Sequence, residues 1–360
     1  MKLAILGTRG VPPNYGGFET FAAELSTRLV ARGHEVTVYC RGARGEDLWN
    51  GVRRIVLPAF GGKYGETVSH TFVSALDAIR RDFDVVLLCN AANAFVVPML
   101  RAARIPVAIN VDGIERKRRK WNVLGRAVYA MGETFSVGFA NAVIADADVI
   151  ARYYQAHYGA ETITIPYGAD FPDEEDSDVL QRLGLREREY ILYVSRFEPE
   201  NNPLEVVRAY EKLDNAPPLV MLGKGLYAPE LVEELHRHAG ERILFPGALY
   251  GLDYRTLQRR ALLYIQATEV GGTHPALIEA MASGGAVLAL GTPENREVGG
   301  DAVGYFAFGP QETLSGTLRE WLSKPLIREE FRALARKRAA ERYSWERVTD
   351  AYELLLSRCR

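Results

Sequence analysis

Short apolar runs alternate along the chain with longer segments whose apolar side chains recur at helical spacing. Residues 16–31 carry such side chains at intervals of three or four, Phe21 and Leu25 among them, which predicts an amphipathic helix. Gly33 then marks the end of that helix, and residues 35–40 have the composition of a strand. Repeated alternation of this kind indicates an α/β protein with helices on both faces of a parallel sheet. In the first half we predict strands at residues 2–7, 35–40, 53–58, 84–89, 105–110, 142–145 and 161–165.

The alternation pauses near residues 168–178, which hold turn formers and a run of acids. A second series then follows, with helices between strands predicted at 190–195, 218–222, 242–245, 262–266 and 286–290. At 360 residues the chain has the length of about two domains. We therefore expect two Rossmann-like, doubly wound domains, at residues 1–168 and 178–340, facing a cleft where ligands bind at the carboxyl ends of the strands. Residues 341–360 are expected to form a C-terminal helix.

Composition excludes several classes of protein. Apolar residues make up 48% and charged residues 25% of the chain, as in soluble globular proteins, and no apolar run approaches the ~20 residues of a membrane span. The first apolar run is too short for a secretory signal, and three widely spaced cysteines imply neither a disulfide framework nor a zinc site. We therefore expect a reduced, cytoplasmic protein. Residues 1–170 hold 20 basic and 16 acidic residues, a net charge of +4, and the rest of the chain holds 24 basic and 30 acidic residues, a net charge of −6. This charge difference is too small to indicate a nucleic-acid binder.

A glycine pair precedes the first helix. The loop from Gly7 lacks the glycine spacing of a dinucleotide fingerprint, but Gly16 and Gly17 would let a phosphate approach backbone N–H groups at a positive helix end. Arg9 in the same loop is either a further anion contact or an ordinary surface residue. An ordinary flexible loop is the alternative interpretation of the glycines.

A second glycine-rich loop precedes a helix in the second half. Gly272, Thr273 and His274 lead into Pro275 at the first helical position, which is typical of a helix start that can bind an anion. Glu279, one turn inside this helix, could accept both hydroxyls of a ribose. It could equally be a solvated helix residue, and His274 could be a cap or a core residue.

Two cations follow neighbouring strands of the second half. Arg196 ends the strand at 190–195, and its planar guanidinium suits phosphate oxygens. Lys224 follows the strand at 218–222. Because the carboxyl ends of parallel strands share one edge of the sheet, the two cations and the glycine-rich helix start favour a diphosphate site there.

One basic segment lies in the first half. It consists of Arg116, Lys117, Arg118, Arg119, Lys120 and Trp121. The segment is either the solvated start of a helix or a contact to an anionic lipid surface, with the tryptophan at the interface.

Taken in order, these motifs resemble those of a known family. They are Gly16-Gly17-Phe18-Glu19, Ile165-Pro166-Tyr167-Gly168, Ser195-Arg196, Leu222-Gly223-Lys224-Gly225 and Leu277-Ile278-Glu279-Ala280-Met281-Ala282. This order is similar to that of retaining GT-B glycosyltransferases of family four. The loop at 7–20 and Asn110-Val111-Asp112-Gly113 resemble the bacterial rhamnosyltransferase-like subgroup of polysaccharide assembly.

The resemblance implies roles for individual residues. It assigns Arg196 to the diphosphate, Glu279 to the ribose and Asp112 to the neighbourhood of the reacting centre. Arg9 and Glu19 would lie on the acceptor side. The remaining donor contacts would be Gly16, Gly17, Asn201, Lys224, Gly272, Thr273, His274 and Leu277. The last helix would pack back on the first domain, as in relatives.

The sequence departs from the family pattern at two positions. Gly271 stands where the first glutamate of the E-x7-E motif is expected, with Glu269 two residues earlier as its candidate substitute. Asn201 stands in place of the usual lysine, so that Lys224 or Arg9 would have to supply the charge. These changes favour a donor sugar with different hydroxyls, such as a 6-deoxyhexose.

The expected reaction is transfer of a sugar, L-rhamnose or another hexose, from a dTDP-, UDP- or GDP-linked donor to a hydroxyl of a lipid-linked or growing glycan. We expect no cofactor, no nucleic-acid partner and no metal, because the cations and helix starts would neutralise the diphosphate. The resemblance implies peripheral binding at the inner face of the membrane. Two alternatives stay open: a nucleotide-sugar epimerase of the same architecture, in which Asp112, Glu19 or Glu269 would move a proton, and a non-catalytic nucleotide-sugar binder.

Overall fold

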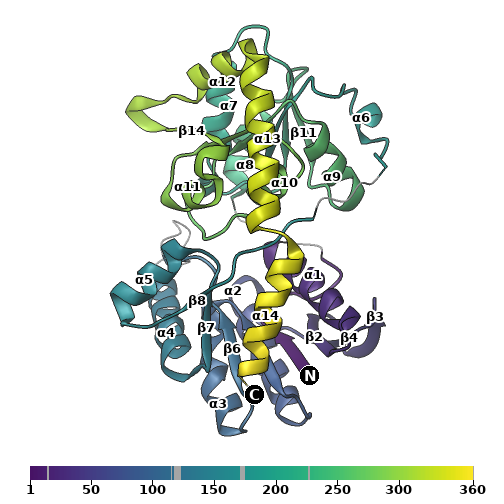
Figure 1. Cartoon of the computed structure of the whole chain (residues 1–360), viewed down its shortest axis with the longest axis vertical. Helices are drawn as coiled ribbons and strands as arrows, with labels where there is room; N and C mark the ends of the chain where they lie inside the picture. The colour runs from purple at the N-terminus through teal and green to yellow at the C-terminus, as the bar shows by residue number, and fades with distance from the viewer. Residues whose placement is uncertain (14–15, 115, 117–122, 171–174, 226–227, 360) are drawn as a thin grey trace. The chain divides into compact units, whose positions relative to one another are not determined.

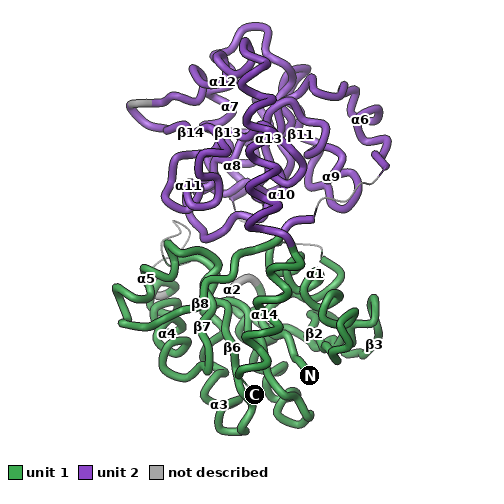
Figure 2. The backbone as a smooth tube through the Cα atoms, in the orientation of Figure 1, with its two compact units in different colours: residues 1–168, 345–360 green, residues 169–344 purple. Residues whose placement is uncertain are grey.

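The chain folds into two compact units (Figure 2). The computed structural model describes residues 1–13, 16–114, 116, 123–170, 175–225 and 228–359. Unit 1 comprises Met1–Gly168 and Trp345–Arg360, and unit 2 comprises Ala169–Ser344. The chain therefore passes between the units at 168/169 and again at 344/345.

Unit 1 is built on a sheet with the strand order β3-β4-β2-β1-β5-β6-β7-β8 (Figure 1). Neighbouring strands are parallel except for β3, which pairs with β4 in the antiparallel sense. The strands are β1 (Lys2–Leu6), β2 (Glu35–Arg41), β3 (Gly45–Trp49), β4 (Val52–Leu57), β5 (Val85–Cys89), β6 (Val107–Asn110), β7 (Ala142–Ala145) and β8 (Ile163–Thr164). The order reverses at β1 and β5, so that the loops following these two strands flank a topological switch point.

The helices of unit 1 cover both faces of this sheet. They are α1 (Gly17–Ala31), α2 (Gly62–Ile79), the 3-10 helix η1 (Ala91–Val96), α3 (Val97–Ala102), α4 (Val123–Phe139), α5 (Asp148–Tyr158) and α14 (Trp345–Arg358). Leu3 to Leu6 of β1 and all of β5 are buried. Continuous apolar runs suit central strands of a parallel sheet because helices exclude water from both faces.

Unit 2 repeats this architecture with the strand order β11-β10-β9-β12-β13-β14, all parallel. The strands are β9 (Ile191–Val194), β10 (Leu219–Leu222), β11 (Ile243–Gly247), β12 (Leu263–Gln266), β13 (Val287–Leu290) and β14 (Gly304–Phe306). The helices are α6 (Val179–Arg182), α7 (Pro203–Glu211), α8 (Pro229–His236), α9 (Gly251–Arg260), α10 (Pro275–Ala282), α11 (Pro293–Gly299), α12 (Leu314–Ser323) and α13 (Pro325–Arg342). Here the switch point lies between β9 and β12.

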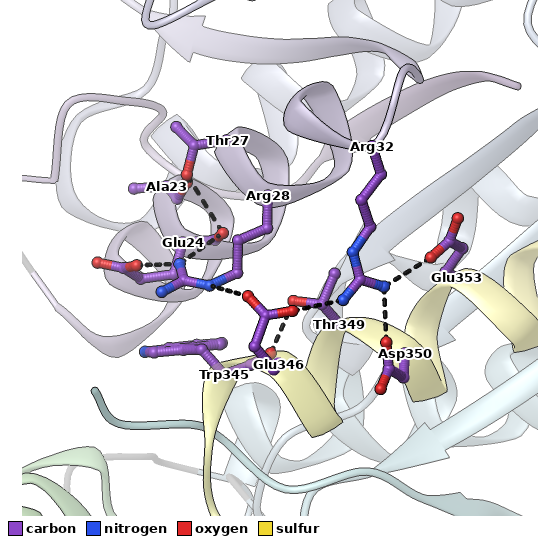
Figure 3. Close-up of polar contacts among 10 residues, drawn as sticks. All are labelled: Ala23, Glu24, Thr27, Arg28, Arg32, Trp345, Glu346, Thr349, Asp350 and Glu353. Carbon is purple, nitrogen blue, oxygen red and sulfur yellow. Dashed lines mark hydrogen bonds and ion pairs between the residues drawn. The ribbon is translucent and has the colours of Figure 1, made fainter. Parts of the chain in front are cut away.

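The last helix, α14, packs on α1 within unit 1 (Figure 3). Arg32 is the C-cap residue of α1. Its guanidinium lies 2.6 Å from a carboxylate oxygen of Glu346, 2.7 Å from Asp350 and 2.6 Å from Glu353 on α14. Exposed ion pairs contribute at most about 1 kcal/mol each, so we assign most of the free energy of packing α14 on unit 1 to its buried face. We assign to the ion pairs the position of α14 along α1. That buried face includes Trp345, Val348, Tyr352 and Leu356.

The strand predictions hold for most of both sheets, with local differences. Two strands were not predicted from the sequence: β3, which is exposed along most of its length, and β14, which has three residues. The strand expected at 161–165 is only two residues long, at Ile163–Thr164. The C-terminal helix expected at residues 341–360 begins only at Trp345, because Tyr343 and Ser344 separate α13 of unit 2 from α14 of unit 1.

In the part of the chain that the structure describes, none of the helices combines the length and the apolar composition that a bilayer crossing requires.

Candidate active site

Arg196 follows β9 at the switch point of unit 2 and is partly exposed. The backbone around it is held by Asn201, whose side-chain amide donates to the Arg196 carbonyl at 2.6 Å. The hydroxyl of Tyr193 donates to the Asn201 carbonyl at 2.7 Å. Asn201 is itself buried, so that this residue shapes the loop that carries the guanidinium.

Lys224 follows the neighbouring strand β10 and is exposed. The N–H of Phe197 donates to the Lys224 carbonyl at 3.2 Å, which joins the two loops. Gly223 is required between them, because its φ is 155° and a Cβ there would lie 1.8 Å from the Ser195 carbonyl oxygen. The structure therefore brings the ends of β9 and β10 together, as expected for the two cations.

The loops after β9 and β12 are joined directly across the switch point. The N–H of Glu269 donates to the carbonyl of Glu200 at 2.9 Å. The side-chain amide of Asn202 donates to the Ala267 carbonyl at 2.9 Å and to the Glu269 carboxylate at 3.1 Å. The carboxylate that could substitute for the missing glutamate is thus bonded to the loop that follows Arg196.

His274, the N-cap residue of α10, fills the space beside Gly271. A Cβ built on Gly271 would lie 2.4 Å from its Nε2. Its Nδ1 lies 2.8 Å from Oδ1 of the buried Asn295. The amide nitrogen of Asn295 donates to the carbonyls of Thr268 and Leu290, at 3.2 and 2.9 Å. Because both amide hydrogens are used, Oδ1 must accept, which makes Nδ1 of the histidine the donor.

The start of α10 has the proline that the sequence placed at the first helical position. Pro275 occupies the first helical position, where an N–H would have no partner within the helix. Gly272 and Thr273 just before it are buried. Leu277 was predicted to contact the donor. Its side chain is fully buried on the inner face of this helix.

Glu279 lies one turn further along α10 and accepts a hydrogen bond that the sequence did not reveal. Its donor is the hydroxyl of Tyr254 on α9. The side-chain amide of Gln258 in turn donates to the Tyr254 oxygen at 2.8 Å. Tyr254 and Glu279 are 25 residues apart in the sequence. Neither this spacing nor the residues next to Tyr254 would identify it as the partner of Glu279.

In unit 1 the loop after β1 is tied to the start of α1 by Glu19. This side chain is buried, and its Oε1 accepts the N–H of Arg9 at 2.8 Å. Burial raises the pKa of the Glu19 carboxyl, against the lowering effect of its backbone hydrogen bonds. Gly16 is the N-cap residue of α1, with Gly17 directly after it, so that Glu19 fixes the position of both glycines relative to Arg9.

Asp112 follows β6 at the same edge of this sheet. Its N–H donates to Oδ1 of Asn110 at 2.9 Å, and its φ of 58° is uncommon for a residue other than glycine. Nδ2 of Asn110 donates to the hydroxyl of Tyr352 on α14 at 2.7 Å. Burial, with smaller contributions from Glu19 and Asp112, raises the pKa of the Cys89 thiol at the end of β5. Through Asn110, the backbone of Asp112 is thus linked to α14.

Arg116 is the one member of the basic segment among the described residues; Lys117, Arg118, Arg119, Lys120 and Trp121 lie outside them. Its guanidinium Nε is 3.5 Å from Oε2 of the buried Glu133 on α4 and bonds to the hydroxyl of Tyr153 on α5. Arg116 therefore joins two helices of unit 1. Among the described residues, no group of three His, Cys, Asp or Glu is arranged to hold a metal ion.

Two family models match the chain in succession. "Glycosyltransferase Family 4" matches residues 15–171, and "Glycosyl transferases group 1" matches residues 178–338. A D-inositol 3-phosphate glycosyltransferase from Nocardiopsis dassonvillei is 26% identical over 273 residues, which span 62% of this chain and 61% of that protein.

The fold also matches solved structures. Sucrose-phosphate synthase from Thermosynechococcus elongatus superposes with a TM-score of 0.84 and 18% identity, covering 99% of this chain and 98% of that one. HepE from Anabaena, solved in complex with UDP-glucose, superposes with a TM-score of 0.82 and 17% identity, covering 99% of each chain. The two successive matches together span most of the chain, which therefore consists of a glycosyltransferase family 4 domain followed by a glycosyltransferase group 1 domain, and its two parallel α/β units have the GT-B fold.

Proposed function

We propose that the protein transfers a sugar, with retention of configuration, from a nucleotide diphosphate donor to a hydroxyl of a lipid-linked or growing glycan. One observation carries the donor site: Arg196 and the glycine-rich start of α10 follow neighbouring strands at the switch point of unit 2. The direct hydrogen bond between Glu269 and Glu200 joins these loops. A guanidinium next to a helix start suits the two phosphates of a leaving nucleotide.

Each group of this site has a distinct task. Arg196 stabilises the negative charge that develops on the leaving diphosphate, and Lys224 adds a second cation on the neighbouring strand. Glu279 accepts ribose hydroxyls. In this proposal the leaving phosphate helps to deprotonate the acceptor, so that no side chain serves as a nucleophile, and Asp112 acts near the reacting centre.

The proposed donor is a dTDP-, UDP- or GDP-linked sugar, with L-rhamnose as the preferred candidate. The support for a nucleotide donor is that HepE, a structural neighbour, has been solved with UDP-glucose. The support for a 6-deoxyhexose is local: Gly271 replaces a carboxylate, and the imidazole of His274 occupies the adjacent space.

The proposed location is the anionic surface of the inner membrane face. Residues 116–120 are five consecutive cations. The helix that follows, α4, exposes apolar side chains at Val123, Val128 and Met131. Cations gain about 1 kcal/mol each near an anionic leaflet, and apolar side chains add to this when they enter the interface.

Activity assays can separate this function from its alternatives. We would incubate the full chain with dTDP-L-rhamnose, UDP-glucose or GDP-mannose, with and without short lipid-linked saccharides, and follow products by mass spectrometry and NMR. A glycosidic product that forms only with an acceptor, and that keeps the anomeric configuration of the donor, is the expected result. Conversion of the sugar without an acceptor would indicate an epimerase, and binding without turnover under any condition would indicate a non-catalytic binder.

A further inference from the structure

Tyr254 and Gln258 lie one helical turn apart on α9 and connect this helix to α10. Nε2 of Gln258 donates to the Tyr254 oxygen at 2.8 Å and to the carbonyl of Ala276, in the first turn of α10, at 3.3 Å. The Tyr254 hydroxyl donates to Oε2 of Glu279. The result is a hydrogen-bonded chain that runs from Gln258 through Tyr254 to the carboxylate.

The direction of this chain follows from the donors available. A backbone carbonyl can only accept, so the Gln258 atom that faces the Ala276 carbonyl must be the amide nitrogen. The two hydrogens of this nitrogen then go to the Ala276 carbonyl and to the Tyr254 oxygen. The phenol oxygen of Tyr254 therefore accepts one hydrogen bond, and its own hydrogen points to Glu279. Reversing the amide would place the Gln258 side-chain oxygen against the Ala276 carbonyl oxygen, which is unfavourable. The Glu279 carboxylate therefore has the Tyr254 hydroxyl as a fixed hydrogen-bond donor on one side.

The phenol remains a donor over the working pH range. Burial, and then the charge of Glu279, raise the pKa of Tyr254 well above its ordinary value. Gln258 is also buried. A hydrogen bond from a neutral hydroxyl to a carboxylate is charge-assisted and sets a preferred orientation of the carboxylate plane.

We propose that Tyr254 is a positioning residue for nucleotide binding, which holds the Glu279 carboxylate in the orientation that accepts the hydroxyls of the donor ribose. This inference rests on the proposed donor site. It predicts that Tyr254 acts on the sugar of the nucleotide specifically. Phosphate contacts, which belong to Arg196 and the start of α10, stay as they are.

The test compares nucleotides that differ only in the sugar hydroxyls. We would measure Kd by calorimetry for UDP and for GDP, each against its 2′,3′-dideoxy analogue, and for dTDP against its 3′-deoxy analogue. The wild type should prefer the hydroxylated member of the pair it binds by at least about tenfold, or about 1.4 kcal/mol. Tyr254→Phe should reduce this preference to about threefold or less. Gln258→Leu should shift it in the same direction by removing the donor to Tyr254.

Tyr250→Phe is the matched control, since Tyr250 precedes the same helix and is half-exposed; its preference should equal that of the wild type. If Tyr254→Phe lowers the affinity for both members equally, its role is only to pack the helix, and the proposal is overturned. Full preference in a folded Tyr254→Phe variant, or a wild type that binds both members alike, would also overturn it. A wild type that binds none of UDP, GDP and dTDP would remove the proposed donor site itself.

Discussion

The imidazole of His274 occupies the space that a side chain at position 271 would need, since a Cβ on Gly271 would lie 2.4 Å from its Nε2. Contacts under 3.0 Å force a shift of one partner. Asn295 holds the ring through Nδ1 at 2.8 Å, which limits how far the ring can move. The absence of a side chain at position 271 and the position of the His274 ring therefore depend on each other.

Gly271→Ala should destabilise unit 2 by about 1–3 kcal/mol, in the range for overpacking. Adding His274→Ala should recover most of this loss, because the clash disappears with the ring. Urea unfolding of the two single variants and the double variant gives the coupling free energy, expected at about 0.5–3 kcal/mol. Gly316→Ala is the control: it lies within α12 with open space around it, and should leave stability equal or higher. Additive effects of the two substitutions would contradict the steric coupling.

Arg196→Ala should lower kcat by about 100-fold or more, on the scale of losing one donor that stabilises developing charge. The fold should persist, because the loop is held through the Arg196 carbonyl, which the substitution keeps. Steady-state kinetics on the best donor check this. Arg208→Ala, an exposed arginine of α7 paired with Glu205, should leave kcat unchanged. Activity within a few-fold of wild type would remove Arg196 from the diphosphate site.

Glu279→Ala should weaken the binding of nucleoside diphosphates, because a ribose contact exists in the ground state as well as in the transition state and acts mainly on KM. Glu269→Ala should change the choice of donor sugar more than nucleotide affinity. Calorimetry and competition between sugar donors separate the two effects. Glu230→Ala, an exposed position in the first turn of α8, serves as the control. Equal nucleotide affinity in wild type and Glu279→Ala would refute the ribose assignment.

Acid should destabilise unit 1 through His70, which is fully buried on α2. Burial lowers its pKa from 6.5 to about 4. The folded state therefore keeps His70 neutral, whereas the unfolded chain binds a proton below pH 6.5. Stability should consequently fall as the pH drops from 6.5 towards 4, with a slope that approaches about 1.4 kcal/mol per pH unit from this group.

His70→Gln keeps an N–H that can reach the Cys40 carbonyl, now 3.0 Å from Nε2 of the histidine, and cannot titrate. Chemical denaturation between pH 4 and 7 should show a shallower pH dependence for this variant than for the wild type. His236→Gln, at an exposed position on α8, is the control and should follow the wild type. Parallel curves for wild type and His70→Gln would show that this histidine does not control the acid response.

Vesicles test the membrane proposal. The protein should sediment with vesicles that contain anionic phosphatidylglycerol, and less so at high salt, because screening shortens electrostatic reach to about 8 Å at physiological ionic strength. Neutralising Lys117, Arg118, Arg119 and Lys120 together should abolish sedimentation. Transfer to a short soluble acceptor should change little.

The matched control neutralises four exposed cations of unit 2: Arg186, Arg208, Arg237 and Lys324. It has the same net charge as the test variant and should still sediment. Met131→Glu on α4 should weaken sedimentation if the apolar face of that helix enters the interface. A wild type that stays in the supernatant at low salt would mean that the basic segment is a solvated surface.

Local pattern was sufficient for most of the secondary structure. Strands such as β5 and helices such as α1 follow from apolar runs and helical periodicity, which depend only on neighbouring residues. Arg196, Lys224 and the start of α10 were also within reach, since each directly follows a strand or opens a helix. Two strands could not be predicted, because β3 is exposed and β14 is short, so that neither has a clear pattern of apolar residues.

Tertiary structure decided the contacts that join distant segments. That Tyr254 meets Glu279 depends on the packing of α9 beside α10. The ion pairs of Arg32 with Glu346 and Glu353 likewise depend on which helix α14 packs against (Figure 3). The order of strands in a sheet and the pairing of helices arise from the burial of whole faces, which is a property of the assembled unit. The sequence by itself thus determined the elements and the strand ends that carry charge, whereas their partners were set by packing.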